Sequence, residues 1–221
     1  MTFQQVFNRL LKAYGPQQWW PGETPFEVMV GAVLTQNTAW TNVERAIVNL
    51  KANHSLDPAA IVDAPHKQLA DWLQPSGYFN IKATRLRNFC RWYLAHGQFA
   101  ALAQWDTESL RKGLLSVNGV GPETADDMLL YAFERPVFVI DAYTRRLFSR
   151  LDMVAGDEGY EHLRAVFETK LPLDVSLFNE YHALIVQHAK DVCKKHPLCA
   201  QCCLSKMCPS NAALEKPAGA L

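Results

Sequence analysis

The sequence predicts an all-α protein made of two helical lobes, and three observations support this prediction. Hydrophobic residues make up 49% of the 221 residues and charged residues 20%, a balance typical of a globular chain with a sizeable core. Apolar residues recur at steps of three and four along most of the chain. The one strong strand-like run, residues 137–140, is short, so we interpret it as a buried connector rather than as part of a sheet.

Short breaks that contain Gly or Pro separate the predicted helices. Helical periodicity covers, in order, residues 3–11, 26–34, 43–50, 69–73, 83–94, 110–117, 125–133, 144–151, 161–171 and 178–190. We expect the first lobe to span residues 22–133 and the second to combine residues 1–21 with 134–210. The chain then crosses between the lobes twice. Residues 211–221 form a tail that is small and polar from Ala212 onward, which predicts disorder.

The net charge and the N-terminal sequence bear on the binding partners and the location of the protein. The formal net charge is zero, which argues against a protein held on nucleic acid by bulk charge alone. Local basic clusters remain, between Lys82 and Arg91 and between Arg145 and Arg150, and either a DNA-facing patch or a solvated helix face explains them. The first residues lack a signal-peptide pattern, and no apolar run is long enough to span a bilayer. We therefore expect a cytoplasmic monomer, associated with the nucleoid if it binds DNA, with no membrane partner.

Residues 107–133 carry the most informative local pattern. A predicted helix over residues 107–116 leads into a turn with Gly119 and Gly121, and a second helix begins at Pro122, a favoured first helical residue. The glycines let the backbone turn sharply, and the amides that open the second helix, near Thr124, form an anion site. The pattern resembles the helix-hairpin-helix motif, which grips DNA phosphates without reading sequence. The alternative is an ordinary corner in a helical bundle.

Asp141 follows the hairpin and the apolar connector. By itself, an aspartate before a helix is a common N-cap. Hairpin, apolar stretch and aspartate in this order resemble the helix-hairpin-helix/Gly-Pro-Asp superfamily of DNA glycosylases, and the resemblance implies that Asp141 is the catalytic carboxylate. Cleavage of an N-glycosidic bond builds positive charge on the sugar, which a fixed carboxylate stabilises, and the carboxylate can also activate the attacking water.

A lysine that often follows this hairpin in similar glycosylases is missing from the chain. Endonuclease III and its close relatives place a lysine two residues after the second hairpin glycine, but this chain has Glu123 there. A carboxylate cannot form the Schiff base through which that lysine cuts the strand. The resemblance therefore implies a monofunctional glycosylase that leaves an abasic site. Lys190 is a remote candidate for a substitute lysine.

Tryptophans are concentrated in the N-terminal part of the chain. Trp19 and Trp20 are adjacent, and Trp40 ends a Thr-Gln-Asn-Thr-Ala-Trp run. In a generic chain such tryptophans are core residues. With the glutamate after the hairpin, these runs resemble the bacterial 3-methyladenine DNA glycosylase III group. The resemblance implies a pocket for a flipped base that is lined by Trp19 or Trp20, Trp40, Glu123 and Lys190. An alkylated purine carries a positive charge that indole faces attract.

Gln36 lies where the same resemblance places a polar side chain that enters the duplex and fills the gap left by the flipped base. The alternative for Gln36 is an ordinary polar residue on a helix face. The resemblance therefore adds Gln36 to the candidate DNA contacts Gly119, Gly121 and Thr124.

Most of the cysteines gather near the C-terminus. Cys193, Cys199, Cys202 and Cys208 are separated by gaps of five, two and five residues, and Cys203 is a spare thiol that could replace Cys202. Four thiolates in a compact loop fit either zinc or a [4Fe–4S] cluster. The loop resembles the cluster loop at the same place in endonuclease III, shortened by one residue in its first gap. The resemblance implies a [4Fe–4S] cofactor.

The sequence thus predicts a DNA glycosylase of base excision repair, a hydrolase with an active cleft between its lobes. Its expected partner is double-stranded DNA with a damaged base, preferably an alkylated purine such as 3-methyladenine. Three alternatives stay open: a glycosylase for oxidised pyrimidines or mismatched bases, with or without lyase activity; a non-catalytic, damage-sensing DNA-binding module; and a redox protein that uses the cluster.

Overall fold

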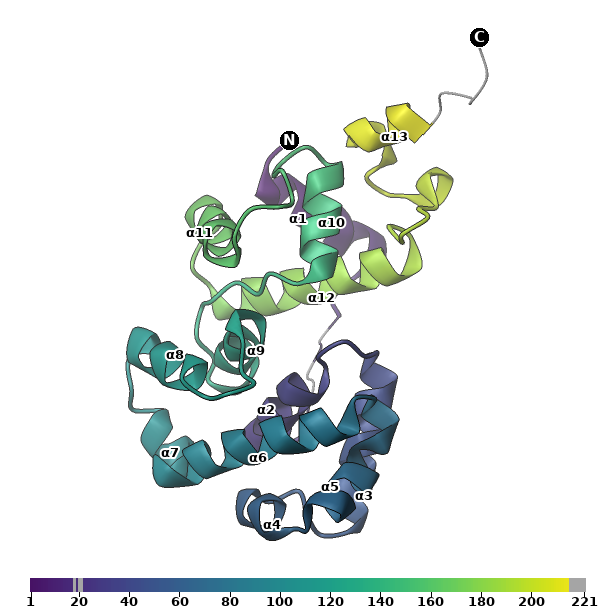
Figure 1. Cartoon of the computed structure of the whole chain (residues 1–221). Coiled ribbons are helices and arrows are strands. Elements are labelled where there is room, and N and C mark those ends of the chain that lie inside the picture. Colours follow the sequence, from purple (N-terminus) through teal and green to yellow (C-terminus); the bar gives the residue numbers. More distant parts are fainter. Residues whose placement is uncertain (18, 20–21, 215–221) are drawn as a thin grey trace. The chain divides into compact units, whose positions relative to one another are not determined.

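The computed structural model describes residues 1–17, 19 and 22–214. Throughout this part of the chain the regular structure is helical and contains no β-strand, which confirms the predicted all-α class. The chain divides into two compact units. Unit 1 comprises Met1–Trp19 and Pro136–Leu221, and unit 2 comprises Trp20–Arg135 (Figure 1).

Unit 2 is built around α2, which is buried from Glu27 to Leu34 and is therefore apolar on all sides. The Thr24 side chain accepts a hydrogen bond from the Glu27 amide and Pro25 begins the helix, so the sequence itself sets its start. Helix α6 lies beside α4 and α5 (Figure 1). The elements are α2 (Pro25–Leu34), α3 (Trp40–Ala52), α4 (Pro58–Asp63), α5 (His66–Leu73), η1 (Gln74–Ser76), α6 (Phe79–Ala95), α7 (Gln98–Leu102), α8 (Thr107–Leu115), α9 (Pro122–Asp127) and the π-type turn η2 (Met128–Ala132).

Unit 1 has an aromatic core in which Phe3 contacts residues far along the chain. The Phe3 ring stacks on Phe148 at 5.1 Å and meets Phe167 edge-on at 4.7 Å. The Tyr181 hydroxyl donates to the Phe3 carbonyl at 2.7 Å. The elements are α1 (Phe3–Tyr14), α10 (Ala142–Arg150), α11 (Tyr160–Lys170), α12 (Val175–Asp191), η3 (Cys199–Gln201), η4 (Ser205–Met207) and α13 (Pro209–Leu214).

Residues 137–140 form the predicted buried connector. They run without a strand partner and are nearly inaccessible to solvent. The Phe138 amide donates to a carboxylate oxygen of Glu168 at 3.0 Å, which satisfies one backbone donor that a sheet would otherwise pair. This segment leads directly to Asp141 at the start of α10.

The structure differs from the prediction mainly in short elements. Helices α4 and α7 were not predicted, because five or six residues give too little periodicity to recognise. The predicted helix 125–133 is instead the end of α9 followed by η2. Helix α13 extends to Leu214, into the segment expected to be disordered from Ala212, and residues 215–221 lie outside the described residues. Within the described chain, the helices are too short or too polar to cross a membrane.

Candidate active site and cysteine pocket

Asp141 is the N-cap of α10, as its place before a helix suggested. Its Oδ1 accepts a hydrogen bond from the Thr144 amide at 2.7 Å. Its other oxygen, Oδ2, lies 3.6 Å from Nε2 of His182 on α12. The Asp141 side chain is 13% exposed and that of His182 6%. The indole of Trp19 stacks against the His182 ring, with centroids 6.0 Å apart. Unit 1 therefore brings Trp19, His182 and Asp141 into one row.

The surroundings of Asp141 favour its charged form. Burial is the largest single influence on its pKa and raises it, but the hydrogen bond and charge of His182, together with the Thr144 amide, outweigh burial. The net pKa lies below the ordinary value for aspartate. A carboxylate that is ionised and shielded from water acts strongly on a nearby positive charge.

An ion pair and a glycine with a positive φ angle fix the shape of the hairpin in unit 2. Arg111 on α8 forms a two-pronged ion pair with the buried Asp126 on α9, at 2.7 and 3.1 Å. Gly119 has φ +102°, and a Cβ there would collide with the Arg85 side chain. Gly121 has ordinary backbone angles, and a Cβ there would meet nothing within 4 Å. The turn therefore needs Gly119 for its shape and leaves Gly121 with an open face.

Gln36 is fastened to this hairpin. Its Nε2 donates to the Gly119 carbonyl at 3.0 Å and to the Thr124 hydroxyl at 2.9 Å, and its Oε1 accepts from the Arg85 guanidinium. Thr124 is buried, so its hydroxyl serves the interior of unit 2. The next residue, Asn37, is exposed and has φ +56°. The end of α2 and the hairpin turn are thus one hydrogen-bonded assembly.

The other predicted pocket residues are spread over the chain. Trp40 begins α3, and its ring lies so close to Gly31 that a Cβ there would sit 3.0 Å from it. Glu123 is exposed in the first turn of α9. Lys190 is exposed near the end of α12, eight residues beyond His182 and thus about 12 Å further along the helix. Trp20 lies outside the described residues.

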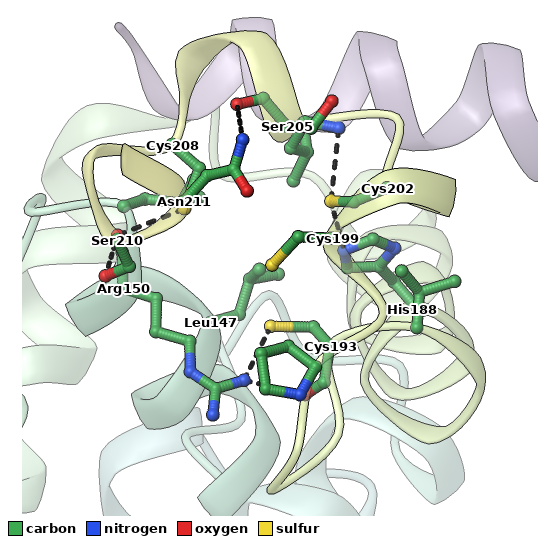
Figure 2. A pocket seen from close by; sticks show the side chains of 14 residues that line it. Leu147, Arg150, His188, Cys193, Cys199, Cys202, Ser205, Cys208, Ser210 and Asn211 are labelled. Atoms are coloured by element: carbon green, nitrogen blue, oxygen red, sulfur yellow. Dashed lines mark hydrogen bonds between the residues drawn. The ribbon is translucent and has the colours of Figure 1, made fainter. Parts of the chain in front are cut away.

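Four cysteines line one pocket of unit 1: Cys193, Cys199, Cys202 and Cys208. Figure 2 shows the sulfurs of Cys193 and Cys199 directed toward the middle of it. Cys203, the fifth cysteine of this region, is absent from the lining residues. Among the residues that the structure describes, no group of three His, Cys, Asp or Glu side chains is placed to hold a single metal ion.

Hydrogen-bond donors lie beside two of the sulfurs of this pocket. The Arg150 guanidinium donates to Sγ of Cys193 at 3.2 Å, and the Leu204 amide donates to Sγ of Cys202 at 3.4 Å. His188, fully buried on α12, places Nε2 3.6 Å from the same Cys202 sulfur (Figure 2). Burial lowers the pKa of His188 to about 4 and raises that of the Cys202 thiol to about 11. The imidazole is therefore neutral at physiological pH.

Comparison with known proteins identifies the family. A model described as "HhH-GPD superfamily base excision DNA repair protein" matches residues 30–173. MJ1434 of Methanocaldococcus jannaschii, named as an inferred DNA repair glycosylase, is 46% identical over 210 residues, which cover 94% of this chain and 96% of that protein. The chain belongs to the HhH-GPD superfamily.

Solved structures with a similar fold agree with this result. The H. pylori 3-methyladenine DNA glycosylase MagIII, bound to 1,N6-ethenoadenine, has a TM-score of 0.72 and 29% identity, and the match covers 86% of this chain and 98% of that chain. A non-covalent endonuclease III–DNA complex has a TM-score of 0.82 over 97% of this chain and 98% of that chain. Its identity of 19% makes this a likeness of fold alone.

Several residues of this HhH-GPD chain escaped the sequence analysis. His182 and His188 are both buried on α12 and touch the two candidate centres of unit 1, Asp141 and the cysteine pocket. In the sequence, these two histidines can be noticed only as polar residues within a largely apolar stretch of the helix. Arg111 and Asp126 gave no signal, because an ion pair across a hairpin has no sequence pattern of its own.

Proposed function

We propose that this HhH-GPD protein is a monofunctional DNA glycosylase that hydrolyses the N-glycosidic bond of a flipped, alkylated purine such as 3-methyladenine. The observation that carries the proposal is the ionised, nearly buried Asp141 with His182 beside it. The family and the relative named as an inferred DNA repair glycosylase support the reaction class. The sugar gains positive charge as its bond to the base breaks, and a fixed carboxylate stabilises that charge.

In this proposal the roles within the site are divided. The Asp141 carboxylate faces the developing charge and orients the attacking water. His182 keeps Asp141 ionised in spite of its burial, and the Thr144 amide fixes the direction of the carboxylate. Trp19, stacked on His182, offers an indole face near this centre.

The absence of strand cleavage rests on Glu123. The residue two positions after Gly121 lacks an amine, so it cannot attack the sugar and form an imine. Lys190 is a poor substitute, because it is exposed and lies about 12 Å along α12 from His182.

The preference for an alkylated purine rests on chemistry and on one relative. Trp19, Trp20 and Trp40 offer electron-rich faces, and the Glu123 carboxylate adds attraction for a cationic base. The relative from H. pylori, at 29% identity, is named for 3-methyladenine and was solved with a modified adenine. An N-alkylated purine is already a good leaving group, so the pocket needs no strong acid.

DNA contacts are assigned to the hairpin, to Gln36 and to exposed lysines. The open face of Gly121 and the amides that begin α9 suit a backbone phosphate. Lys194, Lys195 and Lys206 are exposed around the cysteine pocket and carry charge suited to the same backbone.

A [4Fe–4S] cluster held by Cys193, Cys199, Cys202 and Cys208 is part of the proposal. The residues fit it, because four cysteines line one pocket, and backbone and side-chain N–H groups donate to the sulfurs of two of them. Cys202 is favoured over Cys203 because it lines that pocket. When bound, the cluster braces the loop that carries the exposed lysines. Zinc is the alternative, and measurement of iron, sulfide and zinc in the purified protein decides between them.

Base release tests the function. The protein is incubated with N-methylated duplex DNA and with duplexes that contain oxidised pyrimidines, and the freed bases are identified by chromatography. Release of 3-methyladenine without strand nicks, and no adduct after borohydride treatment, is expected. Release of oxidised pyrimidines with nicks would instead indicate an endonuclease III-type enzyme, which the cysteine loop favours as the second candidate. Tight binding of damaged DNA without release would indicate a damage sensor. Rapid, reversible reduction of the cluster in a protein that does not bind DNA would indicate a redox protein.

A further inference from the structure

Tyr14 and His188 form a chain of polar contacts that the proposed reaction does not use, and His188 lines the cysteine pocket. The Tyr14 hydroxyl, at the end of α1, lies 2.7 Å from Nδ1 of His188. The other ring nitrogen of His188, Nε2, lies 3.6 Å from Sγ of Cys202. Tyr14, His188 and Cys202 come from α1, α12 and the cysteine loop, so folding of unit 1 is needed to align them.

The direction of these hydrogen bonds follows from the sulfur. A cysteine that ligates iron has lost its proton, so its sulfur can only accept. A buried imidazole beside it is a favourable neighbour when Nε2 carries the proton. In a neutral ring Nδ1 then carries a lone pair and accepts from the Tyr14 hydroxyl. The Tyr14 hydroxyl therefore satisfies Nδ1 in the tautomer whose Nε2–H donates to Cys202, in the way that an outer partner orients a metal-ligating histidine.

We infer that Tyr14 and His188 are positioning residues that deliver one N–H to the Cys202 sulfur and thereby raise the reduction potential of the bound cluster. This inference rests on the proposed [4Fe–4S] cofactor. A hydrogen bond to a cluster sulfur draws electron density from it, which favours the reduced state. The same donor makes the cluster harder to oxidise, so it protects the cluster against loss in air.

The test compares purified holoprotein variants by protein-film voltammetry and by the rate at which visible absorption is lost in air. Tyr14→Phe removes only a hydroxyl, and His188→Leu removes the donor while filling a buried site. Both are expected to shift the potential to more negative values and to speed the loss of absorption several-fold. Tyr14→Phe is expected to add nothing in the His188→Leu background, because the two act through one contact. Tyr160→Phe, which removes a hydroxyl that contacts the Ile140 amide in the same unit, is the control and leaves the potential unchanged.

Equal potentials in wild type and Tyr14→Phe, with equal iron content, would overturn the inference, as would independent effects in the double variant. His188→Gln guards against a folding defect, since its amide can still donate to sulfur and should keep the potential closer to wild type. Wild-type protein without iron and sulfide would contradict the cofactor, whereas a normal cluster with unchanged potentials contradicts this inference alone.

Discussion

Asp141 could be singled out from the sequence, but His182 could not. The aspartate follows a hairpin and an apolar connector at a recognisable distance, whereas the histidine comes from a helix late in the chain and reaches Asp141 only by folding. The electrostatic state of Asp141 was equally hidden, because it depends on the balance between burial on one side and His182 and the Thr144 amide on the other.

Replacement of the carboxylate separates catalysis from structure. Asp141→Asn keeps an oxygen that can cap α10, so the melting temperature should change little. Loss of the negative charge should slow release of 3-methyladenine by about 10²–10³-fold, as for other electrostatic groups aimed at a transition state. Single-turnover base release checks the rate, and unchanged release would remove Asp141 from the mechanism.

His182→Leu should move the acid limb of the reaction to higher pH. Without His182, burial of Asp141 is no longer opposed by its main partner, so the pKa of Asp141 rises. A carboxyl with a lowered pKa stabilises the fold above its ordinary pKa and loses that contribution as pH falls. The melting-temperature gap between wild type and variant should therefore narrow on acidification. The rate of base release is measured from pH 4 to 8, and His54→Gln, at an exposed histidine, is the control. Acid limbs that coincide in wild type and His182→Leu would contradict the role assigned to His182.

At the scale of elements, the long helices could be predicted from the periodicity of apolar residues. The contacts that the basic side chains make in the folded protein could not. Several side chains of the two basic clusters donate hydrogen bonds to backbone carbonyls of the same protein. Lys82 is buried, donates to the carbonyls of Leu34 and Ser76, and has its pKa lowered by burial to about 8. Arg150 donates to carbonyls of the cysteine loop. A sequence gives the charge of a residue but not the backbone carbonyls that folding brings to it.

The two hairpin glycines offer a matched pair of substitutions. Gly119→Ala should destabilise unit 2 by about 1–3 kcal/mol, because φ is positive and the added methyl meets Arg85. Gly121→Ala should leave the melting temperature nearly unchanged but weaken DNA binding, since its methyl group would occupy the open face next to the phosphate. Thermal melts and binding to undamaged duplex DNA measure the two effects. Equal DNA affinity of wild type and Gly121→Ala would argue for a plain helical corner.

At the scale of the whole molecule, the helical class was predictable because both units are assembled from amphipathic and buried helices. The cysteine spacing predicted a compact ligand set, and the pocket gathers those four side chains. The sequence left open which of two adjacent thiols belongs to the set, since Cys202 and Cys203 differ only in the direction that the folded loop gives them.

Substitution of the two adjacent thiols tests this assignment. Cys202→Ser should reduce iron content and visible absorption and lower the melting temperature, because metal binding and folding of the loop are linked. Cys203→Ser should retain full iron content, since Cys203 does not line the pocket. Iron analysis and absorption spectra of both variants suffice, and the reverse outcome would transfer the ligand role to Cys203.

The composition of unit 1 from both ends of the chain has a consequence for its biosynthesis. Helix α1 leaves the ribosome long before α12, yet Phe3 packs against Phe148 and Phe167 and accepts a hydrogen bond from Tyr181. Unit 2 is contiguous and can fold while translation continues. During that interval the apolar side chains of α1 have no core to pack into and stay exposed. Chaperone binding during synthesis should therefore concentrate on the first residues of the nascent chain.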